Sequence, residues 1–278
     1  MISPDVVAML RDLDSAASLR RVPYLLVGAA ARVLLCDEVL SIDGRATKDW
    51  DFGVRVEDWP QFDALREALL ATSFRPDPAE HRLRHVSGLR VDLVPFGGPE
   101  GADRCVEWPR SRFRMDVTGF READEDGREI ELADGLSVRV VTLRGLLVLK
   151  AIAYEDRRGH GIEHDLGDLD FILRHADRLL EESRVFDLAG DALRAGRLEY
   201  VDAAAYCLGR DVGRGFGHRA VTKALETVAA RLEDPDSSEV RRLNRHDVGG
   251  GSGVAEARET AARWRALLLG IVDARRGG

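Results

Sequence analysis

Arg45-Ala46-Thr47-Lys48-Asp49-Trp50-Asp51-Phe52-Gly53-Val54-Arg55-Val56 is the most informative stretch of this sequence. Acids alternate here with bulky aromatic residues, which is typical of a strand with one polar and one buried face. Asp49 and Asp51 then lie on the same face, about 6.5 Å apart at the backbone. Four other Asp-x-Asp pairs occur in the chain, but none combines a strand-like segment with alternating aromatics. We therefore expect this pair to bind a metal ion.

A third acid, Asp92, interrupts the apolar segment Leu89-Arg90-Val91-Asp92-Leu93-Val94. Burying such a charge without a partner would cost on the order of several kcal/mol, so a partner is expected. One candidate is magnesium shared with Asp49 and Asp51. The alternative is purely structural, with Asp92 paired to Arg90 or Arg84 and the other two acids on the solvated face of an edge strand.

The order of predicted elements indicates an α/β (α+β) fold with a mixed sheet. The first predicted elements are an amphipathic helix after Pro4, a strand at 24–27, a helix at 29–35, a strand at 49–56, a helix at 61–71 and a strand at 89–94. Short alternating segments at 100–141, with turns at 126–127 and 134–135, are expected to extend the sheet. Helices are predicted at 146–154, 165–180, 185–195, 201–208, 221–232 and 255–274. We expect one domain over 1–141 and a mostly helical one over 142–278.

Composition limits the classes of function. With 278 residues and 45% hydrophobic residues, the chain can bury a large core. A formal net charge of -8 argues against a broad DNA-binding surface. Neither a secretory signal nor a membrane-spanning apolar run is evident, so we expect a cytoplasmic protein without membrane contact. Cys36, Cys105 and Cys207 are interpreted as small core residues rather than as a disulfide framework or zinc site.

Three segments, taken in order, resemble the signature of the DNA polymerase β-like nucleotidyltransferases. They are Leu25-Leu26-Val27-Gly28, then Arg45-Ala46-Thr47-Lys48-Asp49-Trp50-Asp51, then Val91-Asp92-Leu93. Two later segments resemble downstream motifs of AbiEii-type abortive-infection toxins and similar minimal nucleotidyltransferases. They are Leu149-Lys150-Ala151 and His164-Asp165-Leu166-Gly167-Asp168-Leu169. The resemblance covers roughly residues 22 to 175. It implies a catalytic core over 1–141, followed by a helical domain carrying the second set of motifs.

The resemblance also implies roles for individual residues. Asp49, Asp51 and Asp92 would hold two Mg²⁺ ions, and an NTP such as ATP would bind near Gly28, Ala29, Arg45, Thr47 and Lys48. Lys150 would reach the triphosphate as a point charge, oriented by Asp165 or Asp168; alternatively it is an ordinary surface lysine, and Asp165 a helix cap. Ala29 departs from the family, which usually has Gly or Ser there.

The activity implied is transfer of NMP from an NTP to an acceptor. RNA, above all a tRNA 3′ end, fits a toxin of a toxin-antitoxin or phage-defence system, with a cognate antitoxin as a possible partner. An RNA acceptor would require an arginine-lined groove, for which the candidates are Arg110, Arg112, Arg114, Arg157 and Arg158. A small-molecule acceptor such as an antibiotic is the alternative within this class.

Two further interpretations belong to other classes. Ala29 favours a non-catalytic member that binds a protein or RNA, whereas three mutually repelling acids favour an enzyme. Residues 160–164, His-Gly-Ile-Glu-His, satisfy the H-x-x-E-H pattern of zinc peptidases. Gly159 and Gly161 weaken the helix which that motif needs, and no downstream glutamate ligand is evident.

Overall fold

The computed structural model describes residues 3–41, 47–133, 135–158, 164–216, 219–244 and 253–276. The chain divides into two compact units. The first unit comprises Met1–Leu35 and Asp43–Leu146, and the second comprises Cys36–Ile42 and Leu147–Gly278. Each unit is described separately below.

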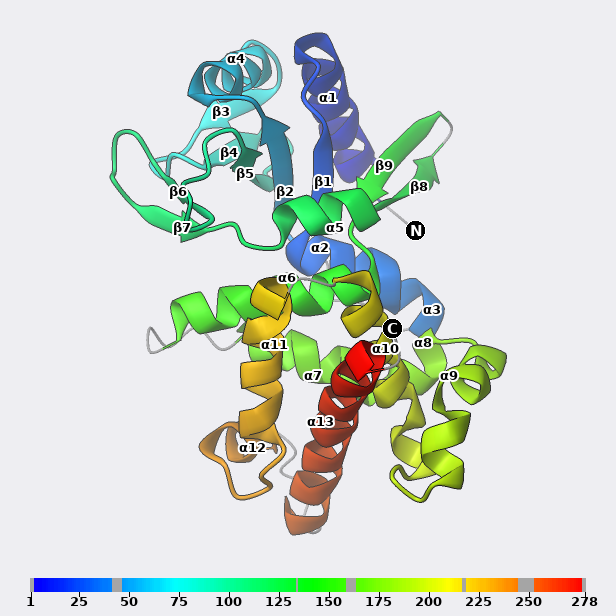
Figure 1. The fold of residues 1–278 in the computed structure, drawn as a ribbon. Coiled ribbons are helices and arrows are strands. Elements are labelled where there is room, and N and C mark those ends of the chain that lie inside the picture. Colours follow the sequence, from blue (N-terminus) through cyan, green and yellow to red (C-terminus); the bar gives the residue numbers. More distant parts are fainter. Residues whose placement is uncertain are drawn as a thin grey trace. The chain divides into compact units, whose positions relative to one another are not determined.

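A seven-stranded mixed sheet organises the first unit, and it confirms the mixed-sheet α+β fold class expected from the sequence (Figure 1). The strand order is β3-β4-β5-β2-β1-β9-β8. The bounds are β1 Tyr24–Val27, β2 Asp49–Val56, β3 Phe74–Pro76, β4 Arg82–His85, β5 Arg90–Gly97, β8 Arg128–Ala133 and β9 Leu136–Val140. β2 pairs with β5 in parallel and with β1 in antiparallel orientation. The strand carrying the acid pair is therefore central, and the interpretation of Asp49 and Asp51 as part of an edge strand was wrong.

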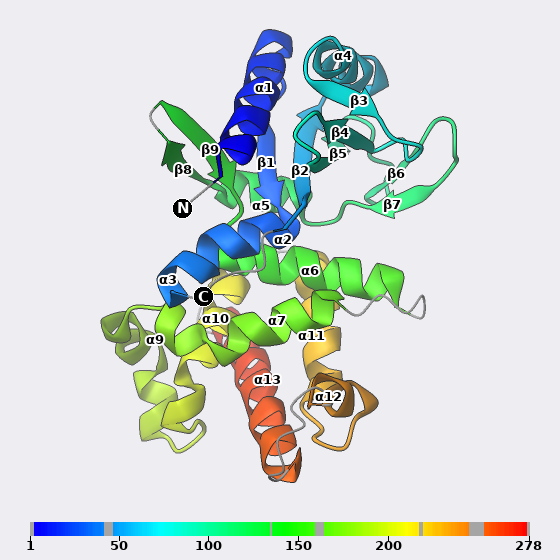
Figure 2. The same ribbon diagram turned by 180° about the vertical axis from the view of Figure 1, so that it is seen from behind.

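Helices of the first unit are α1 Pro4–Arg20, α2 Gly28–Arg32, α4 Trp59–Leu70 and α5 Phe120–Asp126. α1 begins after Ser3, whose hydroxyl accepts a hydrogen bond from the backbone N–H of Val6. Its buried face includes Met9, Leu10 and Leu13, and α1 and α4 lie side by side (Figures 1 and 2). The predicted helix at 29–35 begins one residue earlier and continues through the π-helical Val33–Asp37 into α3 Glu38–Leu40.

The prediction for residues 100–141 was partly wrong. β6 Cys105–Glu107 and β7 Arg114–Asp116 form a separate two-stranded sheet instead of extending the main one. Asp126-Gly127 ends α5 rather than forming a hairpin turn, because Gly127 is the C-cap of that helix. Of the second predicted turn, Gly135 has a φ of 69°, as expected for a tight turn between β8 and β9, while Asp134 lies outside the described residues.

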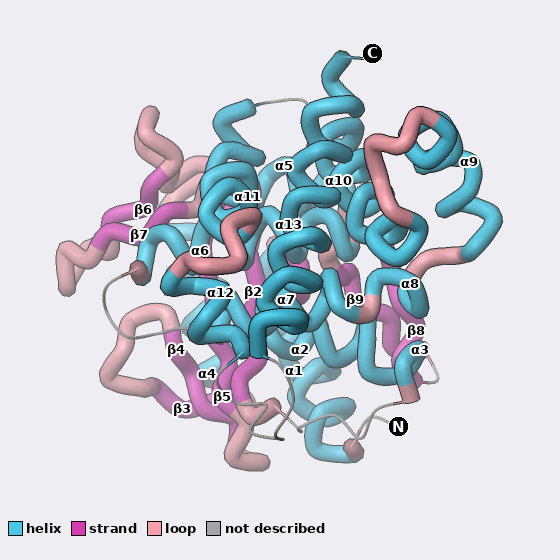
Figure 3. Tube along the Cα trace, turned by 90° about the horizontal axis from the view of Figure 1, so that it is seen from below, coloured by secondary structure: helices cyan, strands magenta, loops and turns pink. Residues whose placement is uncertain are grey.

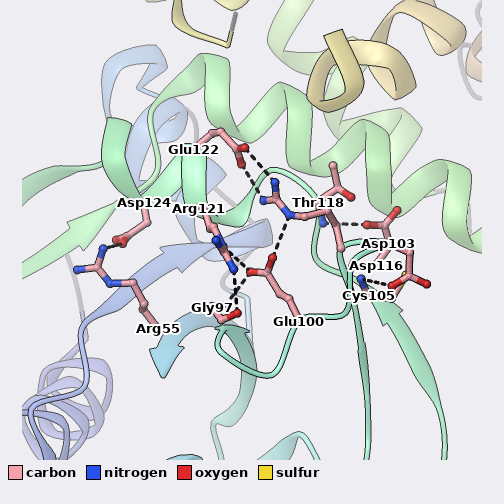
Figure 4. Close-up of polar contacts among 11 residues, drawn as sticks. Arg55, Gly97, Glu100, Asp103, Cys105, Asp116, Thr118, Arg121, Glu122 and Asp124 are labelled. Carbon is pink, nitrogen blue, oxygen red and sulfur yellow. Dashed lines mark hydrogen bonds and ion pairs between the residues drawn. The ribbon is translucent and has the colours of Figure 1, made fainter. Parts of the chain in front are cut away.

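Ion pairs fasten the segment after β5 to α5 (Figure 4). Glu100, whose side chain is only 1% exposed, accepts a hydrogen bond from the backbone N–H of Gly97 and pairs with Arg104 and Arg121. Asp124 of α5 pairs with Arg55 of β2 at 3.2 Å. These contacts fix α5 at the end of β2 and β5 that lies away from Asp49.

Every element that the structure describes in the second unit is a helix (Figure 3). α3 Glu38–Leu40 belongs to this unit, and α6 Leu143–Arg157 runs into it from the first unit. Its other helices are α7 His164–Arg174, α8 Ala176–Leu179, α9 Glu182–Arg194, the short 3-10 helix η2 Tyr200–Asp202, α10 Ala203–Gly215, α11 Arg219–Leu232, α12 Ser238–Leu243 and α13 Gly253–Arg276. Helix α12 was not predicted, and residues 165–180 form two helices instead of one. None of the described helices is long and apolar enough to cross a membrane.

Helices α10 and α13 pack at very short range. A Cβ at Gly209 would lie 2.0 Å from the carbonyl oxygen of Leu267, and a Cβ at Gly270 would lie 2.1 Å from that of Tyr206. Only glycine allows two helix backbones to approach so closely at these positions. The centre of the second unit therefore depends on these glycines as well as on apolar side chains such as Trp264.

Candidate active site on the central strands

The three predicted acids lie on the same face of two neighbouring strands. Asp51 of β2 is the register partner of Asp92 of β5, and Asp49 lies two residues before Asp51. Residues opposite each other in a sheet project from the same face, and so do residues two apart in one strand. Trp50 and Phe52 are buried, 5% and 0% exposed, on the opposite face, as the sequence predicts.

Gly28 follows β1 directly and contacts the sheet face that carries Asp49, Asp51 and Asp92, called the acid face below. Its φ is 68°, and a Cβ at this position would lie 2.1 Å from Oδ2 of Asp51. No other residue fits there without displacing the carboxylate, because both the backbone conformation and the available space require glycine. Close approach of the Gly28 backbone to Asp51 is therefore built into the junction of β1 and α2.

Arginines neutralise two of the acids. Arg82 of β4 donates two hydrogen bonds to Asp92, from Nε to Oδ1 at 2.6 Å and from Nη2 to Oδ2 at 2.7 Å. The hydrogen bond to Asp92 raises the pKa of the Arg82 guanidinium above its usual value. Asp49 pairs with Arg90, whose Nη2 donates to Oδ2 at 2.7 Å. The proposed structural partners of Asp92 were therefore wrong: Arg84 pairs with Asp77, and Asp92 is held by a residue that the sequence analysis did not single out.

His81 borders the same acid. Its Nε2 lies 3.7 Å from Oδ2 of Asp92, and its ring packs against Trp108 with the centroids 5.8 Å apart. Burial lowers the pKa of His81 below the usual value, and the charge of Asp92 opposes this shift only in part. A neutral imidazole beside Asp92 leaves Arg82 as the main counter-charge of that carboxylate.

The donor set suits magnesium in chemistry and in placement on a common face, since carboxylate oxygens are the hard ligands that Mg²⁺ prefers. Among the described residues, however, no three His, Cys, Asp or Glu side chains converge closely enough to hold an ion. Two of the three acids bond arginines instead: Asp92 bonds Arg82, and Asp49 bonds Arg90. Asp51 and Asp92, as register partners, are the two acids best placed to share a cation.

Several predicted nucleotide-binding residues lie beside the acids. The Thr47 hydroxyl donates to the carbonyl of Asp49 at 3.0 Å and accepts from its N–H at 3.2 Å, so it stabilises the start of β2. Lys48 is exposed and Ala29 is half-buried. Arg45 lies outside the described residues, as do His160 and Glu163 of the zinc-peptidase pattern.

Lys150 lies in the second unit and is buried, with 6% of the residue exposed, so its interpretation as a surface lysine was wrong. Its Nζ lies 2.6 Å from Oδ2 of Asp168 and 3.3 Å from Oδ1 of Asp165. Asp165 also accepts a hydrogen bond from Arg157 at 2.5 Å. Both acids predicted to orient Lys150 therefore contact it.

All five arginines predicted to line an RNA groove are paired with carboxylates. Arg110 contacts Glu80, Arg112 contacts Glu107, Arg114 contacts Asp103, Arg157 contacts Asp165 and Arg158 contacts Glu239. An RNA backbone would have to displace these acids, which reduces the gain from phosphate contacts.

A cavity of about 370 Å³ lies at the other end of β1 from Gly28. The hydroxyl of Tyr24 donates to Asp14 there at 3.0 Å, and burial raises the pKa of that tyrosine above its usual value. The three acids do not line this cavity. It is therefore separate from the candidate site.

The sequence matches no protein-family model and no curated protein. Several solved structures show low similarity to the chain. The antibiotic-resistance factor ANT(2'')-Ia is 14% identical, with a TM-score of 0.38, and the match covers 70% of this chain and 98% of that one. An antigenic nucleotidyltransferase-like protein from Paracoccidioides brasiliensis is 16% identical, also with a TM-score of 0.38, over 69% of this chain and 90% of that one. Likeness of this degree does not assign the chain to a family.

Proposed function

We propose that this chain is a metal-dependent nucleotidyltransferase that transfers NMP from an NTP to an acceptor. The observation that carries the proposal is the placement of Asp51 opposite Asp92 on adjacent parallel strands, with Asp49 on the same face. Three carboxylates on one face of a sheet repel one another, and the arginines that offset two of them, Arg82 and Arg90, leave carboxylate oxygens that a divalent cation could bind in their place. The motif resemblance of residues 22–175 supplies the reaction type.

Asp51 and Asp92 would hold magnesium, and Asp49 would join them once released from Arg90. Bound divalent cations neutralise the triphosphate and activate the attacking oxygen in reactions of this kind. Glycine at position 28 lets the Asp51 carboxylate lie against the backbone at the start of α2, and a helix start is where backbone N–H groups can bind phosphate oxygens. Assignment of Lys150, oriented by Asp165 and Asp168, to the triphosphate stays a prediction.

For the acceptor, RNA with a tRNA 3′ end as the main candidate follows from the resemblance to the toxins. A specific observation favours the second candidate, a small molecule such as an antibiotic. All five candidate arginines for RNA contact are already paired with acids. A small acceptor requires no such basic groove.

The test is a transfer assay with each labelled NTP, magnesium, and either total RNA or a panel of aminoglycosides. Label should move to one acceptor class in the wild type, and Asp49→Ala should abolish the transfer. Asp236→Ala is a matched control, because Asp236 is an exposed member of another Asp-x-Asp pair. Transfer that persists in Asp49→Ala would refute the assignment of the metal site.

A further inference from the structure

Asp92 lies between an arginine and another acid in one cross-strand row. Arg82 of β4 is the register partner of Asp92, and Asp92 is the register partner of Asp51. Neighbouring strands lie about 4.8 Å apart, so three charged side chains follow one another on the same face. The backbone of Arg82 thus lies on the side of Asp92 away from Asp51.

Arg82 occupies both carboxylate oxygens of Asp92, the same atoms that a metal ion would need. Its two hydrogen bonds are 2.6 and 2.7 Å long. Only 14% of the Asp92 side chain and 29% of the Arg82 side chain are exposed, so water screens the pair weakly. Bidentate arginine–carboxylate pairs of this kind are among the stronger hydrogen-bonded contacts in proteins.

We propose that Arg82 is the internal counter-ion of the acid face. Arg82 competes with the divalent cation for the oxygens of Asp92, and it thereby sets the affinity of the site for metal. This inference rests on the proposed function, because it takes Asp92 as a metal ligand. Without Arg82, Asp51 and Asp92 would repel each other across neighbouring strands. Arg82 therefore allows the acid face to fold, and it lowers the affinity for metal in return.

The neighbouring row provides a matched control. Arg84 lies two residues after Arg82 on β4, on the same face, and is the register partner of Arg90. It carries the same charge but pairs with Asp77, at 2.7 Å. Removing Arg84 changes the net charge as much as removing Arg82 does, yet it leaves both hydrogen bonds to Asp92 intact.

The experiment is a titration of the full chain with Mn²⁺, without nucleotide, following free Mn²⁺ by electron paramagnetic resonance. Arg82→Gln should bind Mn²⁺ about tenfold more tightly than the wild type, the effect expected from losing one charge-assisted contact. Arg84→Gln should stay within about threefold of the wild type. Arg82→Lys keeps the charge but not the two-pronged contact, and should fall between the two.

Thermal melting keeps the test valid if Arg82→Gln is destabilised. That variant should melt below the wild type without metal, and Mn²⁺ should raise its melting temperature more than it raises that of the wild type. Unchanged or weaker Mn²⁺ binding by folded Arg82→Gln and Arg82→Lys would overturn the inference. The proposed function would still stand if Mn²⁺ binds the wild type and is lost in Asp51→Asn. No Mn²⁺ binding by any variant would overturn both.

Discussion

At the scale of single residues, Gly28 is the position where the site tolerates least change. Gly28→Ala places a methyl group on the carboxylate of Asp51 and forces a non-glycine residue to a φ of 68°. The backbone alone costs about 1–2 kcal/mol. We expect a lower melting temperature and at least tenfold weaker magnesium-dependent NTP binding, measured by calorimetry.

Gly88→Ala separates the two effects of that substitution. Gly88 has a φ of 88°, but nothing lies within 4 Å of the Cβ that alanine would add. It should lose stability through the backbone only and bind NTP as the wild type does. Equal loss of NTP binding in both variants would contradict the role assigned to Gly28.

Glu80 gives a prediction for pH. Burial of Glu80 would raise its pKa, but hydrogen bonds from Ser111 and Arg110 outweigh it and lower the pKa from 4.5 to about 2. The unfolded chain therefore binds a proton more readily, and the stability from Glu80, present above pH 4.5, is lost as the pH falls toward 2. Urea unfolding from about pH 5.5 to about pH 2.5 should show a weaker pH dependence for Glu80→Gln than for the wild type.

The control for this prediction is Glu125→Gln, at an exposed position on α5. It should leave the pH dependence of the wild type unchanged. A Glu80→Gln variant that follows the wild-type curve would show that the contacts of Glu80 with residues 110–111 do not persist in solution.

At the scale of elements, the α10–α13 pair carries the sharpest prediction on stability. Gly270→Ala would place a methyl group 2.1 Å from the carbonyl of Tyr206, which forces the two helices apart. Overpacking of this kind costs about 1–3 kcal/mol, and the better helix propensity of alanine offsets at most about 1 kcal/mol. Chemical denaturation should show a clear net loss.

Gly167→Ala is the matched variant for that helix pair. Gly167 lies in α7 of the same unit, and nothing lies within 4 Å of the Cβ that alanine would add there. Alanine should therefore stabilise the protein by about 0.5–1 kcal/mol through helix propensity alone. If Gly270→Ala were also stabilising, the close approach of α10 and α13 would be wrong.

Elements whose apolar residues alternate or run together were predictable from the sequence, and elements made mostly of polar residues were not. β1 and β2 have the bounds predicted, because apolar residues alternate or run together there. β4 was missed because Arg82-Leu83-Arg84-His85 has one apolar residue, and its strand conformation comes from pairing with β5. Missing β4 also concealed Arg82, the residue that holds Asp92.

At the scale of the whole molecule, the sequence placed the three acids together more reliably than it identified their partners. A shared face follows from the two-residue period within β2 and from the pairing of two apolar strands. Which arginine meets which acid depends on register, and register follows from contacts far apart in the chain, such as Arg82 with Asp92. The close packing at Gly209 and Gly270 could not be predicted either, because it depends on two helices that lie far apart in the sequence.

The most direct test of the central claim is a calorimetric titration of the chain with each of the four NTPs, in magnesium and in EDTA. If the acid face binds metal, at least one NTP should bind, and its affinity should fall tenfold or more in EDTA and in Asp51→Asn. Asp236→Asn should bind that NTP as the wild type does. Affinity that is the same with and without magnesium, or unchanged in Asp51→Asn, would contradict a metal site at Asp49, Asp51 and Asp92.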